Sequence, residues 1–283
     1  MLKDQKDITM DTQCEGKNDT TVKEEENCDP KKFDFSFNPK RDARLIARNA
    51  NKIIGGNPVT QNALDKESLM RYWQQRYRLF SKINDGIIMD EQGWFSVTPE
   101  MLAKYTANRL IPHKNAIILD AFCGAGGNAI QFALAGAYVY AIDLDPIKLR
   151  CALQNAKVYG VQNQITFICG NFFHIAKSFF KERSANGSPI IDGIMLSPPW
   201  GGPEYYNAPV FELEMCSPDG IEIFDYCLKI SQNIAYFLPK QTSAKQLIQL
   251  AAKTDSKNVE IEHNILNSKI KTLTAYFGNV AKK

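Results

Sequence analysis

The sequence predicts an α/β fold in which a mostly parallel sheet ends in an antiparallel hairpin. From Asn115 onward, short apolar runs alternate with helical segments, which is the pattern of parallel strands joined by right-handed crossovers. The last two runs are separated only by a short turn at 266–270, so they can pair only as antiparallel neighbours. With 283 residues, the chain is long enough to bury such a core without a metal or a disulfide.

The apolar runs give seven strands. We expect them at residues 116–120, 138–143, 164–169, 190–196, 233–238, 259–265 and 271–277. In an open parallel sheet, ligands bind outside the carboxyl ends of the strands. The residues that follow the strands are therefore the first candidates for a functional site.

The chain before the sheet divides into two parts, which leaves 99–283 as the core domain. Residues 1–30 hold nine acidic residues and four lysines, a net charge of −5, and almost no aromatic residues, so we expect a disordered acidic tail. Because the whole chain carries +3, residues 31–283 carry +8. This charge favours a polyanion such as RNA only modestly, and an ordinary solvated basic surface explains it equally well.

Residues 31–98 are expected to form a basic arm and a small helical module. Phenylalanines lie among basic residues in 31–48, which we interpret as a solvated linker, with a phosphate-contacting arm as the alternative. Apolar residues recur at near-helical spacing over 65–83 and predict one helix with an apolar and a cationic face. Residues 93–98 read as a short extended piece, followed by a helix that Thr98 caps and Pro99 begins.

The seven cysteines and three histidines show no metal-ligand spacing and no disulfide framework. We therefore expect no bound metal and a reducing, intracellular location. The first ten residues are charged, and no run approaches the ~20 apolar residues that a membrane span requires. The sequence thus predicts a soluble protein without a membrane contact.

A glycine-rich turn, FCGAGGN at 122–128, follows the first strand and its last residue, Asp120. Glycines at such a turn let a ligand approach the backbone closely. The pattern is not the GxGxxG of a dinucleotide site, and the preceding carboxylate would repel phosphate. The turn therefore predicts a cofactor that carries positive charge.

Two further strand ends support a nucleoside cofactor. Asp143 lies 23 residues after Asp120 and is expected to accept hydrogen bonds from both ribose hydroxyls. Asn171 follows the third strand, where a polar side chain would meet the adenine amino group. Asp145 and Pro146 read instead as a helix start. Together the three strand ends predict S-adenosyl-L-methionine.

The fourth strand is followed by Ser197-Pro198-Pro199-Trp200, a pattern of amino-group methylation. The Ser197 oxygen and the Pro198 carbonyl would accept the two N–H bonds of a planar amine, while Trp200 stacks on the base. Catalysis would rest on positioning and electrostatics rather than on a dedicated base. The structural alternative is a loop stiffened by two prolines.

The identity of two of these residues favours a cationic base. A serine hydroxyl is a weaker hydrogen-bond acceptor than a carboxylate. It therefore suits a substrate whose amine is already acidic or whose purine ring is already positively charged. The electron-rich indole of Trp200 would attract a cationic 7-methylguanine by about 0.5–2 kcal/mol.

The chain resembles the trimethylguanosine synthases, which convert the 7-methylguanosine cap of small nuclear and nucleolar RNAs to 2,2,7-trimethylguanosine. The resemblance runs from about residue 65 to the end and is most specific in WFSVTPE and SPPWGGP. Other matching segments are RYWQQRYRLFSKINDGI, DAFCGAGGNAIQFA, AIDLDPIKLRCALQNAKVYG, SPDGIEIF, NIAYFLPK and KTLTAYFG. It implies a Rossmann-like, seven-stranded class I methyltransferase sheet and S-adenosyl-L-methionine as cofactor.

The resemblance also implies roles for individual residues. Ser197, Pro198 and Trp200 would act at the guanine N2. The implied cofactor contacts are Phe80, Thr98, Asp120, Cys123, Gly124, Gly126, Asp143, Asn155 and Asn171. The implied substrate contacts are Trp200, Ser197, Pro199 and Tyr205, with Arg71 and Lys240 at the cap phosphates. Asn171 departs from the aspartate more frequent in this family, for which we expect an altered cofactor affinity and not a loss of activity.

Two other functions fit parts of the sequence. One is methylation of adenine N6 or guanine N2 within rRNA, tRNA or DNA, and the other is a non-catalytic module that binds caps or RNA. The resemblance implies capped RNA as the partner, with small nuclear or nucleolar ribonucleoprotein proteins beside it. It also implies a monomer located in the nucleus and nucleolus and in part in the cytoplasm.

Overall fold

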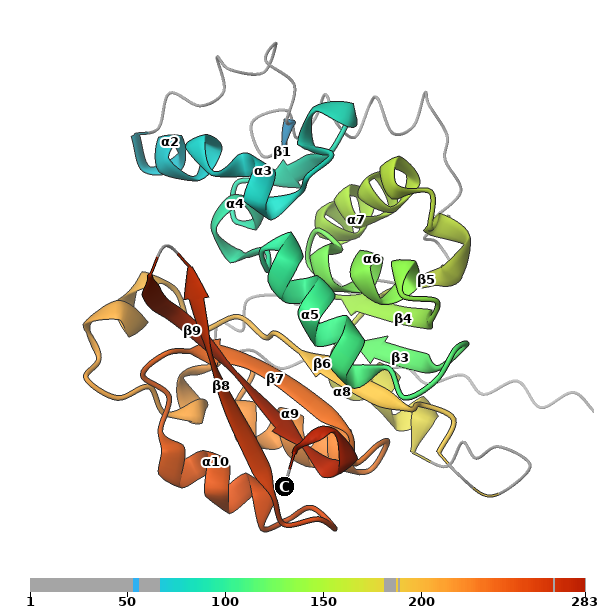
Figure 1. Ribbon diagram of the computed structural model, residues 1–283, viewed down its shortest axis with the longest axis vertical. Helices are drawn as coiled ribbons and strands as arrows, with labels where there is room; N and C mark the ends of the chain where they lie inside the picture. The colour runs from blue at the N-terminus through green and yellow to red at the C-terminus, as the bar shows by residue number, and fades with distance from the viewer. Residues whose placement is uncertain (1–52, 56–66, 181–186, 188, 267, 283) are drawn as a thin grey trace, which may run out of the picture.

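The computed structural model describes residues 53–55, 67–180, 187, 189–266 and 268–282. The predicted acidic tail and basic arm lie outside these residues. The described residues comprise a large sheet, the helices that pack on it and the module that precedes it (Figure 1).

A seven-stranded sheet with the strand order β5-β4-β3-β6-β7-β9-β8 forms the centre of the molecule. β3 to β7 are parallel, while β9 runs antiparallel to both β7 and β8. This confirms the predicted sheet and its closing hairpin. The strands are β3 Ile117–Asp120, β4 Tyr138–Asp143, β5 Ile165–Cys169, β6 Gly193–Leu196, β7 Ile234–Pro239, β8 Val259–Leu266 and β9 Lys269–Phe277.

The fourth predicted strand begins three residues later than expected. The Asp192 carboxylate, and not a backbone carbonyl, accepts the hydrogen bond from the Ile117 N–H at 2.8 Å. The Asp192 N–H still donates to the Ile117 carbonyl at 2.8 Å, and paired residues of the ladder begin at Ile118 and Gly193. The strand is shorter than its apolar run because a side chain replaces its first backbone partner.

Helices cover both faces of the sheet. Successive residues of a strand point to opposite faces, and accordingly Ile118 packs in one buried cluster and Leu119 in the other. The first cluster lies under α5 Glu100–Leu110, α6 Gly127–Leu134 and α7 Pro146–Tyr159, and the second under α8 Phe172–Ala176, α9 Gly220–Leu228 and α10 Ala244–Ala251. Short 3-10 turns lie at η3 Ile83–Asp85, η4 Gln162–Gln164, η5 Lys177–Phe179, η6 Pro203–Asn207, η7 Leu213–Met215 and η8 Gly278–Val280.

The single helix expected at 65–83 is instead two, α2 Glu67–Gln74 and α3 Arg76–Leu79. The break falls at Gln75, whose φ of −103° and ψ of 10° are not helical. α3 then ends where Phe80 becomes extended and turns inward, leaving only 1% of its surface exposed. Burial of one aromatic ring thus overrides a helical pattern.

Residues 93–98 are also not extended as predicted, because Gly93–Ser96 forms the short helix α4. The Asp90 carboxylate accepts from the Gly93 N–H at 3.0 Å, and Trp94 next to it is fully buried. The predicted cap of the following helix is wrong as well. Pro99 occupies the cap position, and the Thr98 hydroxyl instead accepts a hydrogen bond from the Asn128 amide at 3.2 Å.

The N-terminal module is bound to the sheet domain through α7 (Figure 1). It contains α2 to α4 and the antiparallel strands β1 Ile53–Gly55 and β2 Ile88–Asp90. Asn155 of α7 exchanges two hydrogen bonds with the Ile88 backbone, at 2.8 and 2.9 Å. Lys148 pairs with Asp90 at 2.7 Å, and the Tyr159 hydroxyl accepts from the Lys82 N–H at 3.4 Å. One face of α7 therefore carries much of the attachment.

Replacing Arg109 by alanine is expected to destabilise the fold. Its guanidinium bonds Glu260 and Glu262 of β8 at 2.6 and 2.7 Å and the Val280 carbonyl at 2.7 Å. Loss of the guanidinium leaves Glu262 with the Tyr105 hydroxyl and Glu260 with the Lys282 N–H as donors, but without their cationic partner, so the free energy of unfolding should fall by about 2–3 kcal/mol at pH 7. Urea unfolding measures the loss, with the exposed Lys104→Ala on the same helix as control.

The effect should depend on pH. Burial acts to raise the pKa of Glu260, but the hydrogen bonds from Arg109 and from the Lys282 N–H, together with the attraction of both cations, hold that pKa below its ordinary value. The stabilisation is thus complete above the ordinary carboxylate pKa and is lost as the pH falls through the lowered one. An equal difference between wild type and Arg109→Ala at pH 7 and at pH 3 would contradict this account.

Within the described residues, no helix has the length and apolar character to cross a membrane. The same part of the chain holds no cluster of three or more histidine, cysteine or acidic side chains suited to a metal ion. Cys123, Cys151, Cys216 and Cys227 are buried as free thiols.

Candidate active site

The candidate site lies at the carboxyl edge of the parallel strands. Asp120 and Asp143 end β3 and β4, and Asn171, Ser197 and Lys240 follow β5, β6 and β7. The register brings these ends together, since Asp120 pairs with both Ala141 and Met195, and Asp143 pairs with Cys169. The predicted cofactor and substrate residues of the sheet therefore share one edge.

Two glycines let the turn after β3 pack closely. Gly126 has a φ of +86°, and a Cβ there would lie 3.1 Å from Ala152 of α7. A Cβ at Gly127 would lie 2.7 Å from Val97. Both positions are required by protein packing, because a larger residue would push α6 away from α7 and from the N-terminal module.

Gly124 differs from these two. Its φ is +52°, and no atom lies within 4 Å of the position that a Cβ would take. Its N–H donates to the Asp143 carboxylate at 2.8 Å. The turn is thus open on the side of Gly124, where a ligand can approach the backbone.

Asp143 is held in place by the backbone. Its second oxygen accepts from the Asp145 N–H at 2.9 Å, so each carboxylate oxygen carries one hydrogen bond and keeps a further lone pair. Burial raises the pKa of Asp143, although these two backbone hydrogen bonds oppose the rise. A fixed carboxylate with two free acceptor positions fits the predicted contact with a ribose diol. Asp145 itself caps α7, as predicted, by accepting from the Ile147 N–H at 2.8 Å.

Asp120 is the least satisfied polar group of the site. It is fully buried, and neither carboxylate oxygen accepts a hydrogen bond of normal geometry from the described residues. Burial, and then repulsion by Asp143, raise its pKa to about 7, while the nearby amides of Ala129 and Phe122 oppose the rise. An unpaired buried carboxylate is costly unless a cation faces it. The residues present therefore fit a positively charged cofactor such as S-adenosylmethionine.

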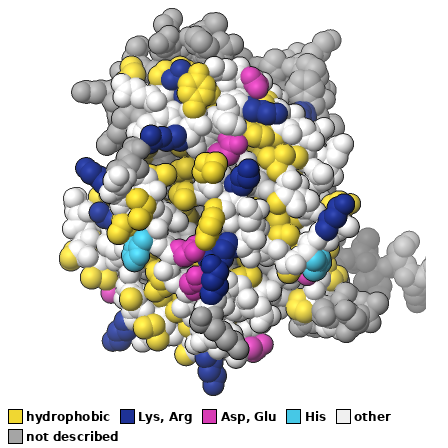
Figure 2. Space-filling model, viewed as in Figure 1, with side chains coloured by type: hydrophobic (Ala, Val, Ile, Leu, Met, Phe, Trp, Pro, Cys, Tyr) yellow, Lys and Arg dark blue, Asp and Glu magenta, His cyan; other side chains and the backbone are white. Residues whose placement is uncertain are grey.

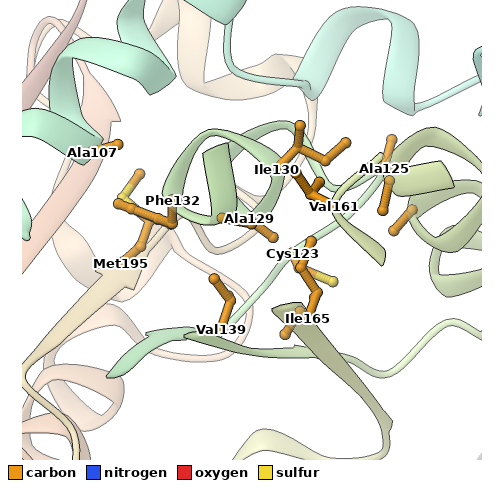
Figure 3. Close-up of a cluster of buried hydrophobic side chains, with 14 of the residues drawn as sticks. Ala107, Cys123, Ala125, Ala129, Ile130, Phe132, Val139, Val161, Ile165 and Met195 are labelled. Carbon is orange, nitrogen blue, oxygen red and sulfur yellow. The ribbon is translucent and has the colours of Figure 1, made fainter. Parts of the chain in front are cut away.

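Cys123 packs in the core beside this turn. Figure 3 shows it among Ile130, Val139 and Ile165, side chains of α6, β4 and β5. Burial, followed by repulsion from Asp143 and Asp120, raises the pKa of its thiol well above the ordinary value. Cys123 therefore stays protonated and cannot serve as a thiolate nucleophile.

Three predicted cofactor residues lie behind the turn. Asn155 is fully buried, and its amide donates to Ile88 and to the Ala125 carbonyl, both at 2.9 Å. Thr98 bonds Asn128 near the start of α6, and Phe80 packs 6.2 Å from the ring of Tyr159. These contacts hold the turn from the protein side. A direct contact of these residues with the cofactor stays a prediction.

Asn171 caps the helix α8. Its side-chain oxygen accepts from the Phe173 N–H at 2.9 Å. The carboxamide oxygen is thus shared with the backbone, and the NH₂ group is left to face a ligand. The predicted contact with the adenine amino group remains a prediction, for which the second lone pair of the carboxamide oxygen can accept from that amino group.

The Ser197 loop presents acceptors. The Ser197 hydroxyl donates its single proton to the Phe122 carbonyl at 3.2 Å, so its lone pairs remain for an incoming N–H. The Pro199 carbonyl accepts from the Ser217 N–H at 3.0 Å, whereas the described residues provide no donor for the Pro198 carbonyl. Two neighbouring oxygens are therefore available for the two hydrogens of an amine.

Two aromatic rings pack against Trp200. Phe237 of β7 lies 5.6 Å from it at an angle of 33°, and Tyr205 lies 5.3 Å away at 86°. The indole remains partly exposed, although its N–H is buried without an acceptor among the described residues. Sequence reasoning missed Phe237, since an aromatic residue in a fully buried strand cannot be distinguished from ordinary core.

The predicted phosphate contacts are placed only in part. Lys240 is exposed directly after β7, and its neighbour Gln241 donates to the Tyr205 carbonyl at 2.8 Å, which joins this end of β7 to the Tyr205 loop. Arg71 belongs to α2, but its side chain lies outside the described part. Figure 2 shows basic side chains scattered among hydrophobic ones and not gathered into one patch on this face.

Comparisons with known proteins agree with this geometry. A family model described as RNA cap guanine-N2 methyltransferase matches residues 115–280. The chain is 38% identical to a trimethylguanosine synthase of Schizosaccharomyces pombe over 64% of its own length and 74% of the relative's. It is 38% identical to one of Saccharomyces cerevisiae over 74% of its own length and 65% of the relative's.

A solved structure supports the fold. A putative methyltransferase from Porphyromonas gingivalis W83 superposes with a TM-score of 0.54 and 13% identity, covering 87% of this chain and 60% of that one. At this identity the likeness concerns the fold alone.

Proposed function

This chain belongs to the RNA cap guanine-N2 methyltransferase family, and from that premise we propose which residues carry the reaction and which RNAs are modified. It is an S-adenosylmethionine-dependent enzyme that methylates the guanine N2 of an RNA cap. The observation that carries the residue assignment is the pair of free acceptors at Ser197 and Pro198, beside the partly exposed ring of Trp200.

The acceptor half of the site positions the amine. Ser197 Oγ and the Pro198 carbonyl accept its two N–H bonds and orient the nitrogen lone pair away from the loop. When bound, S-adenosylmethionine supplies a methyl group on a positively charged sulfur. As positive charge develops on the nitrogen, the two hydrogen bonds strengthen, so these residues stabilise the transition state more than the ground state. The methylated nitrogen then releases its extra proton to solvent, so the described site needs no dedicated base.

The half of the site that holds the methyl donor complements the positive charge of the cofactor. Asp120 places an unpaired carboxylate against the cofactor, and Asp143 offers its two remaining acceptor positions to the ribose. Trp200 holds the base through stacking, with an added cation–π attraction of about 0.5–2 kcal/mol if the base is 7-methylated. The chain thus selects a cationic purine over a neutral one.

The proposed product is 2,2,7-trimethylguanosine on small nuclear and nucleolar RNAs. The names of the two yeast relatives support the trimethylated product. One site suffices for two transfers, because the monomethylated product can leave and bind again. Following the same resemblance, we place the protein in the nucleus and nucleolus and in part in the cytoplasm, in contact with ribonucleoprotein components.

Mass analysis of 7-methyl-GTP after incubation with enzyme and S-adenosylmethionine tests this function. We expect products that carry one and then two added methyl groups, and none from GTP or unmodified RNA. Ser197→Ala, which removes one acceptor, serves as the low-activity control. Equal methylation of GTP or of internal RNA positions would instead indicate an amino methyltransferase that does not require the cap.

A further inference from the structure

Two further aromatic rings continue from the base-binding indole. Tyr205 stands edge-on to Trp200 at 5.3 Å, and Tyr206 stacks on Tyr205 at 4.2 Å and 28°. The rings of Trp200 and Tyr206 are therefore at most 9.5 Å apart, the sum of the two spacings. We call Trp200, Tyr205 and Tyr206 the aromatic ladder.

The inner part of the ladder is rigidly supported. Tyr205 also contacts the ring of Phe211 at 6.1 Å, and its carbonyl accepts from Gln241 at 2.8 Å. Phe211 is fully buried and bonds the backbone of Gln241 at 2.9 Å. Tyr205 is thus fixed on several sides, and burial raises its pKa, so its ring stays neutral.

The outer ring is exposed without an obvious structural reason. Tyr206 keeps 67% of its surface exposed although one of its faces is covered by Tyr205. Its other face is therefore open to solvent. A flat ring that is held by a stacked neighbour loses little entropy when a base stacks on it, and such rings bind single-stranded RNA in many proteins.

We propose that Tyr206 binds the base of the first transcribed nucleotide, the one joined to the cap by the triphosphate. This rests on the proposed function. In this arrangement Trp200 stacks on the cap base, and the RNA continues past Tyr205 to Tyr206. Lys240 is adjacent to Gln241, which bonds Tyr205, and this is where the phosphates would pass. The site therefore binds a capped RNA more tightly than a lone cap nucleotide, whatever the identity of its first base, because every base can stack.

The test compares Tyr206→Ala with wild type on two substrates, 7-methyl-GTP and a short RNA with a 7-methylguanosine cap. For the capped RNA we expect KM to rise about tenfold, which corresponds to about 1.4 kcal/mol, with kcat little changed. For 7-methyl-GTP we expect KM to change less than twofold. Tyr206→Phe keeps the ring and should restore the capped-RNA KM.

Tyr138→Ala provides the matched control, because this tyrosine is 54% exposed but begins β4 at the opposite edge of the sheet. It should leave both KM values at the wild-type level. An equal rise of KM for both substrates in Tyr206→Ala, or no rise for either, would overturn the inference while the proposed function stands. If wild-type enzyme methylated neither substrate, the proposed function itself would fall.

Discussion

Alanine in place of Trp200 is expected to lower kcat/KM on a 7-methylguanosine cap by roughly 30- to 150-fold. The indole supplies both stacking and cation–π attraction, together about 2–3 kcal/mol. The loss should appear mainly in KM, because the two acceptors at Ser197 and Pro198 remain. Steady-state kinetics with 7-methyl-GTP measure it.

Two control measurements distinguish the role of Trp200 in binding the base from its role in stabilising the fold. Trp200 also packs on Phe237 and Tyr205, so thermal unfolding of the variant has to show that the domain remains folded at the assay temperature. Trp200→Phe keeps a smaller and weaker ring and should fall between wild type and alanine. If the alanine variant lost affinity for 7-methylated and unmethylated guanine nucleotides to the same extent, the charge of the base would play no part.

Asparagine at position 120 should abolish cofactor binding and at the same time stabilise the unliganded protein above pH 7. The pKa of Asp120 is raised from 3.8 to about 7 in the fold, so the folded state retains a proton that the unfolded state releases. The resulting cost is absent below about pH 4 and complete above pH 7, where it reaches at most ~4 kcal/mol. Removing the charge should recover about 2–4 kcal/mol at pH 8.

Urea unfolding at pH 4 and pH 8 measures the stability change, and calorimetry with S-adenosylmethionine measures binding. Wild type should bind the cofactor more weakly as the pH falls below 7, since binding then requires loss of the proton from Asp120. Asp255→Asn changes an exposed aspartate and controls for the loss of charge alone. A lower stability of Asp120→Asn than of wild type at pH 8 would mean that the carboxylate is satisfied in the free protein.

The parallel sheet and the residues at its edge could be predicted because both are encoded locally. Each strand is a short apolar run, and the residue after it must lie at the carboxyl edge, so Asp120, Asp143 and Ser197 were found without knowledge of the packing. The N-terminal module was predicted less well. Its helix breaks and its added helix α4 depend on where Phe80 and Trp94 are buried, and no local pattern specifies that.

The hydrogen bonding and charge of the two site carboxylates also could not be predicted from the sequence. Acids at positions 120 and 143 suggested a cationic cofactor, but only the structure distinguishes the unpaired Asp120 from the backbone-bonded Asp143. Phe237, which packs on the base-binding ring, and Gln241, which bonds Tyr205, come from a neighbouring strand and the residues after it. Their function depends on strand order, which is a property of the whole fold.

The hydrogen bonds between Asn155 of α7 and Ile88 of β2 determine where this protein can be truncated without loss of its fold. The match to the family model starts at residue 115, yet Leu69, Trp73 and Trp94 pack in the same buried cluster as the sheet. In addition, the Asn155 amide donates a hydrogen bond to the Ile88 carbonyl. A truncated protein starting at 115 would expose that cluster to water and leave the Asn155 side chain without its two hydrogen bonds to Ile88. The smallest autonomous folding unit therefore begins well upstream of residue 115, and the two parts should unfold together on heating.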